Sequence, residues 1–203
     1  MNKWIVVLVV LMLAAPAMAQ LAGLPIAGGA TAMKGVGASG GVVLGDDFNL
    51  YGARVNFAPA DGVLFFGDAG ALDPDEGDMG WAIQGGGQFT LPVELPVDLA
   101  LRGAIGFGGF DAEEVDVSAT LMTLNGGLVV SKTIETLTPY AFLGINYADT
   151  TVEIKGYDDE SEDETDAVVA GGLSVALNEQ ISLYGEIAYI DDVFFGFGAR
   201  MNF

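Results

Sequence analysis

Apolar side chains recur at every second position through most of the chain after residue 20. The last segment shows this most clearly, because Val193, Phe195 and Phe197 alternate with Phe194, Gly196 and other small or polar residues. A two-residue period is typical of a β-strand with two different faces. No segment after residue 20 keeps a helical period, so the pattern predicts an all-β fold.

The alternating segments and the turn residues between them predict ten strands. Their expected ranges are 33–44, 47–58, 62–72, 79–91, 96–109, 114–131, 139–155, 166–177, 180–190 and 193–203. The sixth segment loses its alternation between Met122 and Asn125, which predicts a β-bulge. Tyr189 and Val193 share one face, so we expect an odd-length turn at Ile190-Asp191-Asp192.

The first nineteen residues have the features of a secretory signal. Lys3 gives a positive start, residues 4–15 are apolar, and Ala17-Met18-Ala19 fits a cleavage site. A membrane anchor is the alternative, but the apolar run is shorter than the roughly 20 residues that a spanning helix needs. We therefore expect a signal peptide at 1–19, a periplasmic N-terminal segment at 20–32 and a barrel at 33–203.

The amino-acid composition excludes several kinds of functional site. The chain has 28 acidic and 7 basic residues, a formal net charge of −21, and no Cys or His. Disulfides, cysteine-based zinc sites and any mechanism with a histidine base are excluded. The few basic residues form no phosphate-binding patch. We therefore expect no nucleic-acid partner.

The arginines indicate which face of each strand points inward. Arg54, Arg102 and Arg200 lie mid-strand on the face that is not apolar. An arginine facing lipid at mid-membrane costs roughly 2–4 kcal/mol, so a membrane barrel places it in the lumen. We expect a lumen charge network formed by Arg54, Asp68, Asp98, Arg102, Glu186 and Arg200. The connections also divide into two sets, since the acidic clusters fall in alternate connections, as expected if those face outside the cell.

The C-terminal strand ends on an aromatic residue, Phe203. Residues 51–57 (YGARVNF) and 197–203 (FGARMNF) match position by position with conservative exchanges. With the signal and the alternating strands, this pattern resembles the small bacterial outer-membrane β-barrels of the OmpA and OmpX type, and matches no single member. The resemblance implies a closed antiparallel up-and-down transmembrane β-barrel in the bacterial outer membrane. We favour ten strands over the eight usual in that group, and expect Phe203 to be the signal read by the barrel-assembly machinery.

Two acidic segments are candidate sites for a divalent cation. Asp73, Asp75 and Asp78 surround a glycine with oxygen donors at alternate positions, which suits calcium or magnesium. The second segment comprises Asp158, Asp159, Glu160, Glu162, Asp163 and Glu164, and is also explained as a solvated, self-repelling loop. A bound cation would bridge the segment to lipopolysaccharide. No firm metal site and no other cofactor is expected.

Three functions fit this sequence. The first is a non-enzymatic outer-membrane barrel with a structural or surface-interaction role that displays acidic extracellular loops. The second is a narrow pore that prefers cations, because an acidic mouth concentrates them. The third is a secreted soluble β-barrel that binds an apolar ligand, although continuous outward apolar residues disfavour it.

Overall fold

The computed structural model describes residues 28–46, 48–74, 78–112, 117–154, 160–190 and 192–203. Over these residues the chain forms ten strands and no helix, and hence no helix long and apolar enough to cross a bilayer. The strands are β1 (Gly35–Leu44), β2 (Phe48–Ala60), β3 (Val63–Pro74), β4 (Gly80–Thr90), β5 (Asp98–Ala112), β6 (Val117–Ser131), β7 (Leu137–Ile154), β8 (Glu160–Ala176), β9 (Ile181–Ile190) and β10 (Asp192–Asn202). The expected signal peptide at 1–19 lies outside the described residues.

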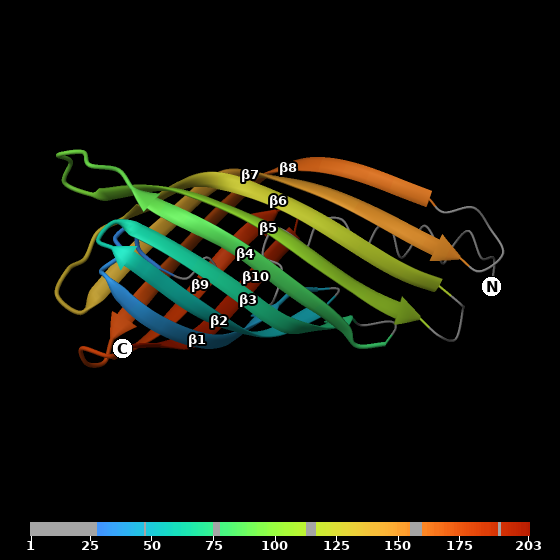
Figure 1. The fold of residues 1–203 in the computed structure, drawn as a ribbon, viewed down its shortest axis with the longest axis horizontal. Coiled ribbons are helices and arrows are strands. Elements are labelled where there is room, and N and C mark those ends of the chain that lie inside the picture. Colours follow the sequence, from blue (N-terminus) through green and yellow to red (C-terminus); the bar gives the residue numbers. More distant parts are fainter. Residues whose placement is uncertain (1–27, 47, 75–77, 113–116, 155–159, 191) are drawn as a thin grey trace.

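Every strand pairs antiparallel with its neighbours in sequence, and β1 closes the wall against β10 (Figure 1). The result is a closed up-and-down barrel. The prediction of ten strands is confirmed, and the eight-strand alternative is wrong because the first hairpin, β1–β2, is a full part of the wall. We name the end of the barrel that carries Phe203 the C-terminal rim, and the opposite end the far rim.

The outer surface is apolar and the inner surface is mixed, as the alternation predicted. Outward residues at mid-wall such as Leu143 and Ile145 are each 63% exposed, whereas the neighbouring Phe142 and Asn146 are buried. Exposed aromatic side chains lie on the outer surface near both rims, and such girdles are typical of barrels in a membrane. They include Phe57, Phe65, Phe89 and Phe203 at the C-terminal rim, and Tyr51, Trp81 and Tyr189 towards the far rim.

Two details of the strands differ from the sequence-based expectation. The bulge expected between Met122 and Asn125 is wrong, since β6 keeps an unbroken register with β5 and β7. The alternation seemed lost because the inner wall is apolar towards the far rim, so that Leu121 points inward while Leu124 points outward. The register shift lies instead between Phe57 and Ala60, where Pro59 has no N–H to donate to the ladder.

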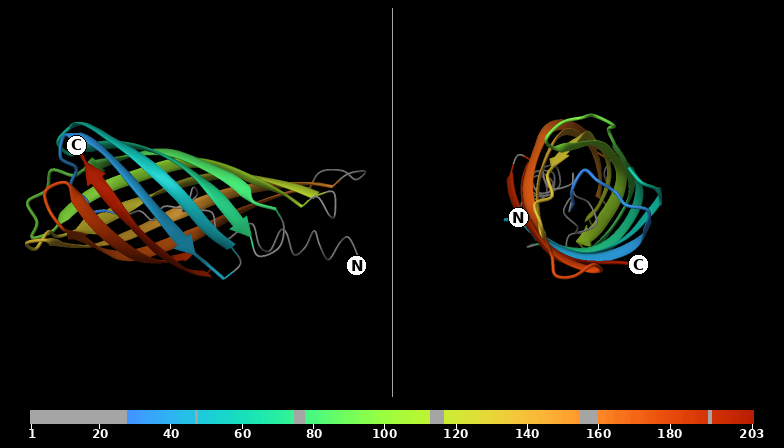
Figure 2. Two further views of the ribbon diagram at one scale, coloured as in Figure 1. Left: turned by 90° about the horizontal axis from the view of Figure 1, so that it is seen from below. Right: turned by 90° about the vertical axis from the view of Figure 1, so that its left-hand side faces the viewer.

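Strands β5 to β8 are longer than the rest and project beyond the other strands at the far rim (Figures 1 and 2). The expected connection between the segments 139–155 and 166–177 is therefore partly wrong, because residues 160–165 belong to β8 and pair with β7. The polar outer face explains the projection. Beyond Tyr147, the outward side chains of β7 change from apolar to Asp149, Thr151 and Glu153. We call the four long strands beyond this point the projecting sheet.

The final hairpin has the predicted parity. Tyr189 pairs with Val193, and Ile187 pairs with Phe195, so the apolar residues of both strands share the outer face. The turn is thus odd in length; its residue Asp191 lies outside the described residues.

Candidate functional site

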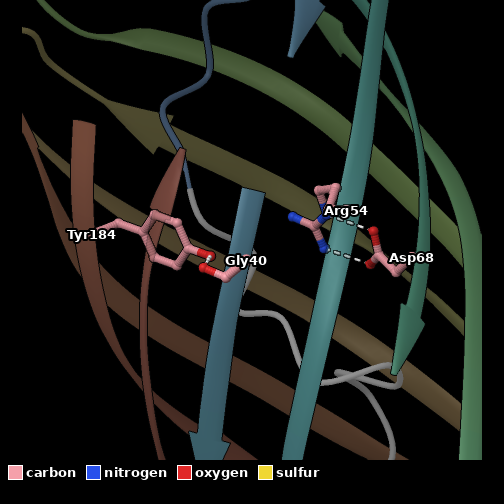
Figure 3. Close-up of polar contacts among 4 residues, drawn as sticks. All are labelled: Gly40, Arg54, Asp68 and Tyr184. Atoms are coloured by element: carbon pink, nitrogen blue, oxygen red, sulfur yellow. Dashed lines mark hydrogen bonds and ion pairs between the residues drawn. The ribbon is translucent and has the colours of Figure 1, made fainter. Parts of the chain in front are cut away.

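The centre of the lumen holds a buried ion pair between directly paired residues of β2 and β3. The Nε of Arg54 donates to Oδ1 of Asp68 and its Nη2 donates to Oδ2, both at 2.7 Å (Figure 3). The two side chains are 2% and 0% exposed. Such a two-point geometry gives each carboxylate oxygen a charge-assisted hydrogen bond, which offsets part of the cost of removing both charges from water.

Phe66 links this pair to a second arginine. The Cζ of Arg54 lies 4.8 Å from the centre of the Phe66 ring, and that of Arg102 lies 4.0 Å from it. The Phe66 ring lies against β4, where its direct partner is Gly86. Any side chain at residue 86 would collide with the ring. Two guanidinium groups therefore share one aromatic ring at the middle of the barrel.

The sequence repeat at residues 51–57 and 197–203 places two equivalent arginines on either side of β1. Ser39 on β1 pairs with Arg54 on one side and with Arg200 on the other, so the two copies place equivalent arginines beside the same residue. Ser39 and Arg54 are buried, and Arg200 is partly buried. Arg200 and Glu186 both lie within electrostatic reach of Arg102. Three guanidinium and two carboxylate groups thus gather across the lumen.

Tyrosines complete this layer. The hydroxyl of Tyr184 donates to the carbonyl oxygen of Gly40 at 3.2 Å, across the junction of β9, β10 and β1 (Figure 3). Tyr140 lies within electrostatic reach of Glu186, from which it is separated by Gly172 on the intervening strand β8. Both rings are 5% exposed and fill space that water or solutes would otherwise occupy.

Asp98 lies apart from this group. It is the first residue of β5, at the C-terminal rim, and it pairs with Ser131. Arg102 is four residues further along the same strand, a rise of about 13 Å. Of the six residues expected in the lumen network, the structure therefore brings five to one level and places Asp98 at the edge.

Residues 28–32 cross the opening of the barrel at the C-terminal rim, ahead of β1 (Figure 2). The N–H of Ala30 donates to Oγ of Ser131 at 2.7 Å, and its carbonyl accepts from Oγ1 of Thr90 at 2.6 Å. Gly29 accepts from Gln88, and Ala30 is 0% exposed. We call residues 28–32 the strap.

Sequence reasoning did not identify the strap or its partners. Gln88, Thr90 and Ser131 are polar and lie on inward faces, at the same end of their strands. Inward polar residues at the same end of two strands could have indicated a buried segment there. Because these residues are neutral, they form no charge pattern that would have marked the site. The expected periplasmic segment 20–32 thus has its last five residues in the barrel mouth, and residues 20–27 lie outside the described residues.

The acidic candidates are spread over two places. Asp73 is the next-to-last residue of β3, and the N–H of Asp78 donates to the carbonyl of Asp111 at 3.0 Å. Glu160, Glu162, Asp163 and Glu164 lie on β8 in the projecting sheet and are exposed. Asp75, Asp158 and Asp159 lie outside the described residues. Within the described ranges no three acidic side chains are grouped to hold a metal, so cation binding stays a prediction.

Phe203 ends the chain beside β1. Its N–H donates to the carbonyl of Val36 at 2.8 Å, and its side chain is 74% exposed. The position is open to the surroundings, as recognition by another protein requires. Its role as an assembly signal stays a prediction.

These features define a transmembrane β-barrel: the antiparallel wall is closed, the exterior is apolar with aromatic girdles, and the charges in the lumen are buried. A family model described as "Outer membrane protein beta-barrel domain" matches residues 5–202. The chain belongs to this family, and it is a protein of the bacterial outer membrane.

Several solved structures are similar to the chain. The N-terminal β-barrel domain of OprF from Pseudomonas aeruginosa is 15% identical, with 84% of this chain and 98% of that chain covered and a TM-score of 0.42. Ail, the attachment invasion locus protein of Yersinia pestis, is 15% identical over 84% and 100%, with a TM-score of 0.35. Neisserial surface protein A is 12% identical over 85% and 99%, with a TM-score of 0.42. No curated protein matches the chain in sequence.

Proposed function

We propose that this barrel is a sealed, non-enzymatic membrane anchor that presents the projecting sheet at the cell surface for interaction. The observation that carries the proposal is the filled centre of the lumen. Arg54 and Arg102 pack on Phe66 at mid-wall, Asp68 pairs with Arg54, and the buried Tyr140 and Tyr184 lie in the same layer. A filled lumen is compatible with an anchoring role, whereas transport needs an open one.

The strap adds a second closure below this layer. Residues 28–32 are held by side chains from β4 and β6, so a solute entering from the C-terminal rim meets a segment that is bonded to two strands of the wall. The charges also disfavour a cation pore. Three arginines and two carboxylates leave the central layer net positive, which raises the energy of a passing cation.

Conductance in planar bilayers tests the seal. We expect the purified mature protein to produce no discrete channels, because the central layer blocks the lumen. The double variant Phe66→Ala, Arg102→Ala removes the ring and one of the two arginines that pack on it, and should give small discrete openings. Discrete channels from the wild-type protein would overturn the proposal and favour the cation-preferring pore.

The surface role needs the far rim to face outside. The chain has no cysteine, so single-cysteine variants label cleanly. Asp163→Cys places a thiol on the projecting sheet, and Thr133→Cys places one in an exposed turn at the C-terminal rim. With an impermeant maleimide on intact cells, we expect labelling at 163 and none at 133 until the outer membrane is opened. The reverse result would overturn the orientation.

A further inference from the structure

One edge of β8 has a neighbouring strand over only half its length. β8 pairs with β7 from Glu160 onward, whereas the described ladder with β9 begins at Val169. The other half of β8, in the projecting sheet, has β7 on one side and, among the described residues, no strand on the other. An edge of this kind is a template for pairing with another chain.

The hydrogen bonds at the base of the hairpins show which residues face this edge. The N–H of Ala176 donates to Thr136, which precedes β7, and the N–H of Leu177 donates to Ile181 of β9, both at 2.8 Å. Alternate residues of a strand direct their backbone groups to opposite sides. Even-numbered residues of β8 therefore bond to β7, and the odd-numbered Ser161, Asp163 and Thr165 direct N–H and C=O to the edge.

The side chains along this edge set the chemistry of a matching strand. Residues 160 to 165 are all exposed. Glu160, Glu162 and Glu164 point to one face of the sheet and repeat at about 6.7 Å, the two-residue rise of a strand. A strand added to the edge brings its own side chains to within about 5 Å of these positions. Lysine or arginine at every second position would meet a carboxylate each time.

We propose that the edge formed by Ser161, Asp163 and Thr165 binds an extended segment of a partner protein with basic residues at alternate positions. Backbone pairing supplies the affinity, and the carboxylates supply the choice of partner. A second copy of this chain is a poor occupant, because it would place its own carboxylates opposite these. The inference rests on the proposed function, which puts this sheet at the cell surface.

The test uses the mature protein in lipid nanodiscs and a nine-residue peptide in which lysine alternates with threonine. The control peptide has the same composition with its lysines contiguous. We expect the alternating peptide to bind at least about tenfold more tightly, because only its lysines share one face of a strand. Equal binding of both peptides would show attraction by charge alone and would overturn the proposal.

Two variants separate backbone pairing from charge. Thr165→Pro removes an N–H directed to the edge while every carboxylate remains, and should weaken the alternating peptide about tenfold or more. The triple variant Glu160→Gln, Glu162→Gln, Glu164→Gln keeps the backbone and should abolish the preference for alternating lysines. Unchanged binding in Thr165→Pro would overturn the strand-addition model. If Thr165→Pro fails to fold, N-methylation of alternate peptide residues blocks the same bonds from the other side.

The two proposals fail differently. If neither peptide binds while bilayers stay silent and the thiol at 163 labels from outside, the edge inference is wrong and the sealed surface anchor stands. If the thiol at 163 is inaccessible on intact cells, the proposed function itself is wrong.

Discussion

The ring of Tyr140 on β7 lies across Gly172, its direct cross-strand partner on β8. A methyl group at residue 172 would collide with the ring and hydroxyl of Tyr140. The same relationship recurs on the inner wall, where Phe66 covers Gly86 and Tyr184 covers Gly198. Inward glycines therefore allow large rings to lie flat against the wall of a narrow barrel.

Two adjacent glycines of β8 test this relationship. Gly172→Ala forces the Tyr140 ring to move and should destabilise the barrel by about 1–3 kcal/mol. Gly171 points outward and a Cβ there meets nothing within 4 Å, so Gly171→Ala should be neutral or stabilising by about 0.4–1 kcal/mol. Guanidinium unfolding in detergent micelles measures both. Equal destabilisation by the two variants would contradict the packing role.

The Arg54–Asp68 pair should be strongly coupled. Asp68→Asn leaves Arg54 buried without its carboxylate, close to Arg102 on the same ring, and we expect a loss of about 3–5 kcal/mol. Arg54→Met alone should cost a similar amount. The double variant should cost much less than the sum, because neither charge is then left uncompensated.

An exposed carboxylate provides the control for that cycle. Asp61 accepts a hydrogen bond from the N–H of Lys34 at the C-terminal rim, where water competes. Asp61→Asn should change unfolding free energy by less than about 1 kcal/mol. Additive costs for Arg54→Met and Asp68→Asn would mean that the two side chains do not act as a pair.

The alternation of side chains was enough to predict the barrel, because one face of nearly every strand must meet lipid. It placed Arg54, Arg102 and Arg200 inside because an arginine that faces lipid in the middle of the wall is costly. It could not predict where along the axis each charge lies, so Asp98 was grouped with residues about 13 Å away.

Residues outside the alternating pattern were harder to predict. The acidic segment at Glu160–Asp166 looked like a loop because charge clusters usually end strands. It continues β8 because its backbone bonds to β7 above the apolar band, where both faces of a sheet can meet water. The strap was missed because the three neutral side chains that hold it are far from it in the sequence, and the alternation of residues carries no sign of such contacts.

The strap should loosen when its side-chain partners are removed. Ser131→Ala together with Thr90→Val deletes the acceptor and the donor that hold Ala30, and should speed amide exchange at Ala30 about tenfold or more. Thr133→Val is the matched control, since Thr133 contacts Thr138 at the same rim. Hydrogen exchange by NMR in micelles measures the change. Unaltered exchange at Ala30 would mean that the strap is held by other contacts.

The position of the membrane along β7 can be measured with one substitution at two depths. Leu143 is 63% exposed in the apolar band, and Thr151 lies eight residues further on the same outer face, in the projecting sheet. Leu143→Arg should destabilise the folded barrel in lipid by about 2–4 kcal/mol, while Thr151→Arg should cost about 0–1 kcal/mol. Unfolding titrations in lipid vesicles give both values. A large cost at Thr151 would place that residue inside the bilayer, and the four long strands would then cross the membrane at a steeper tilt instead of projecting beyond it.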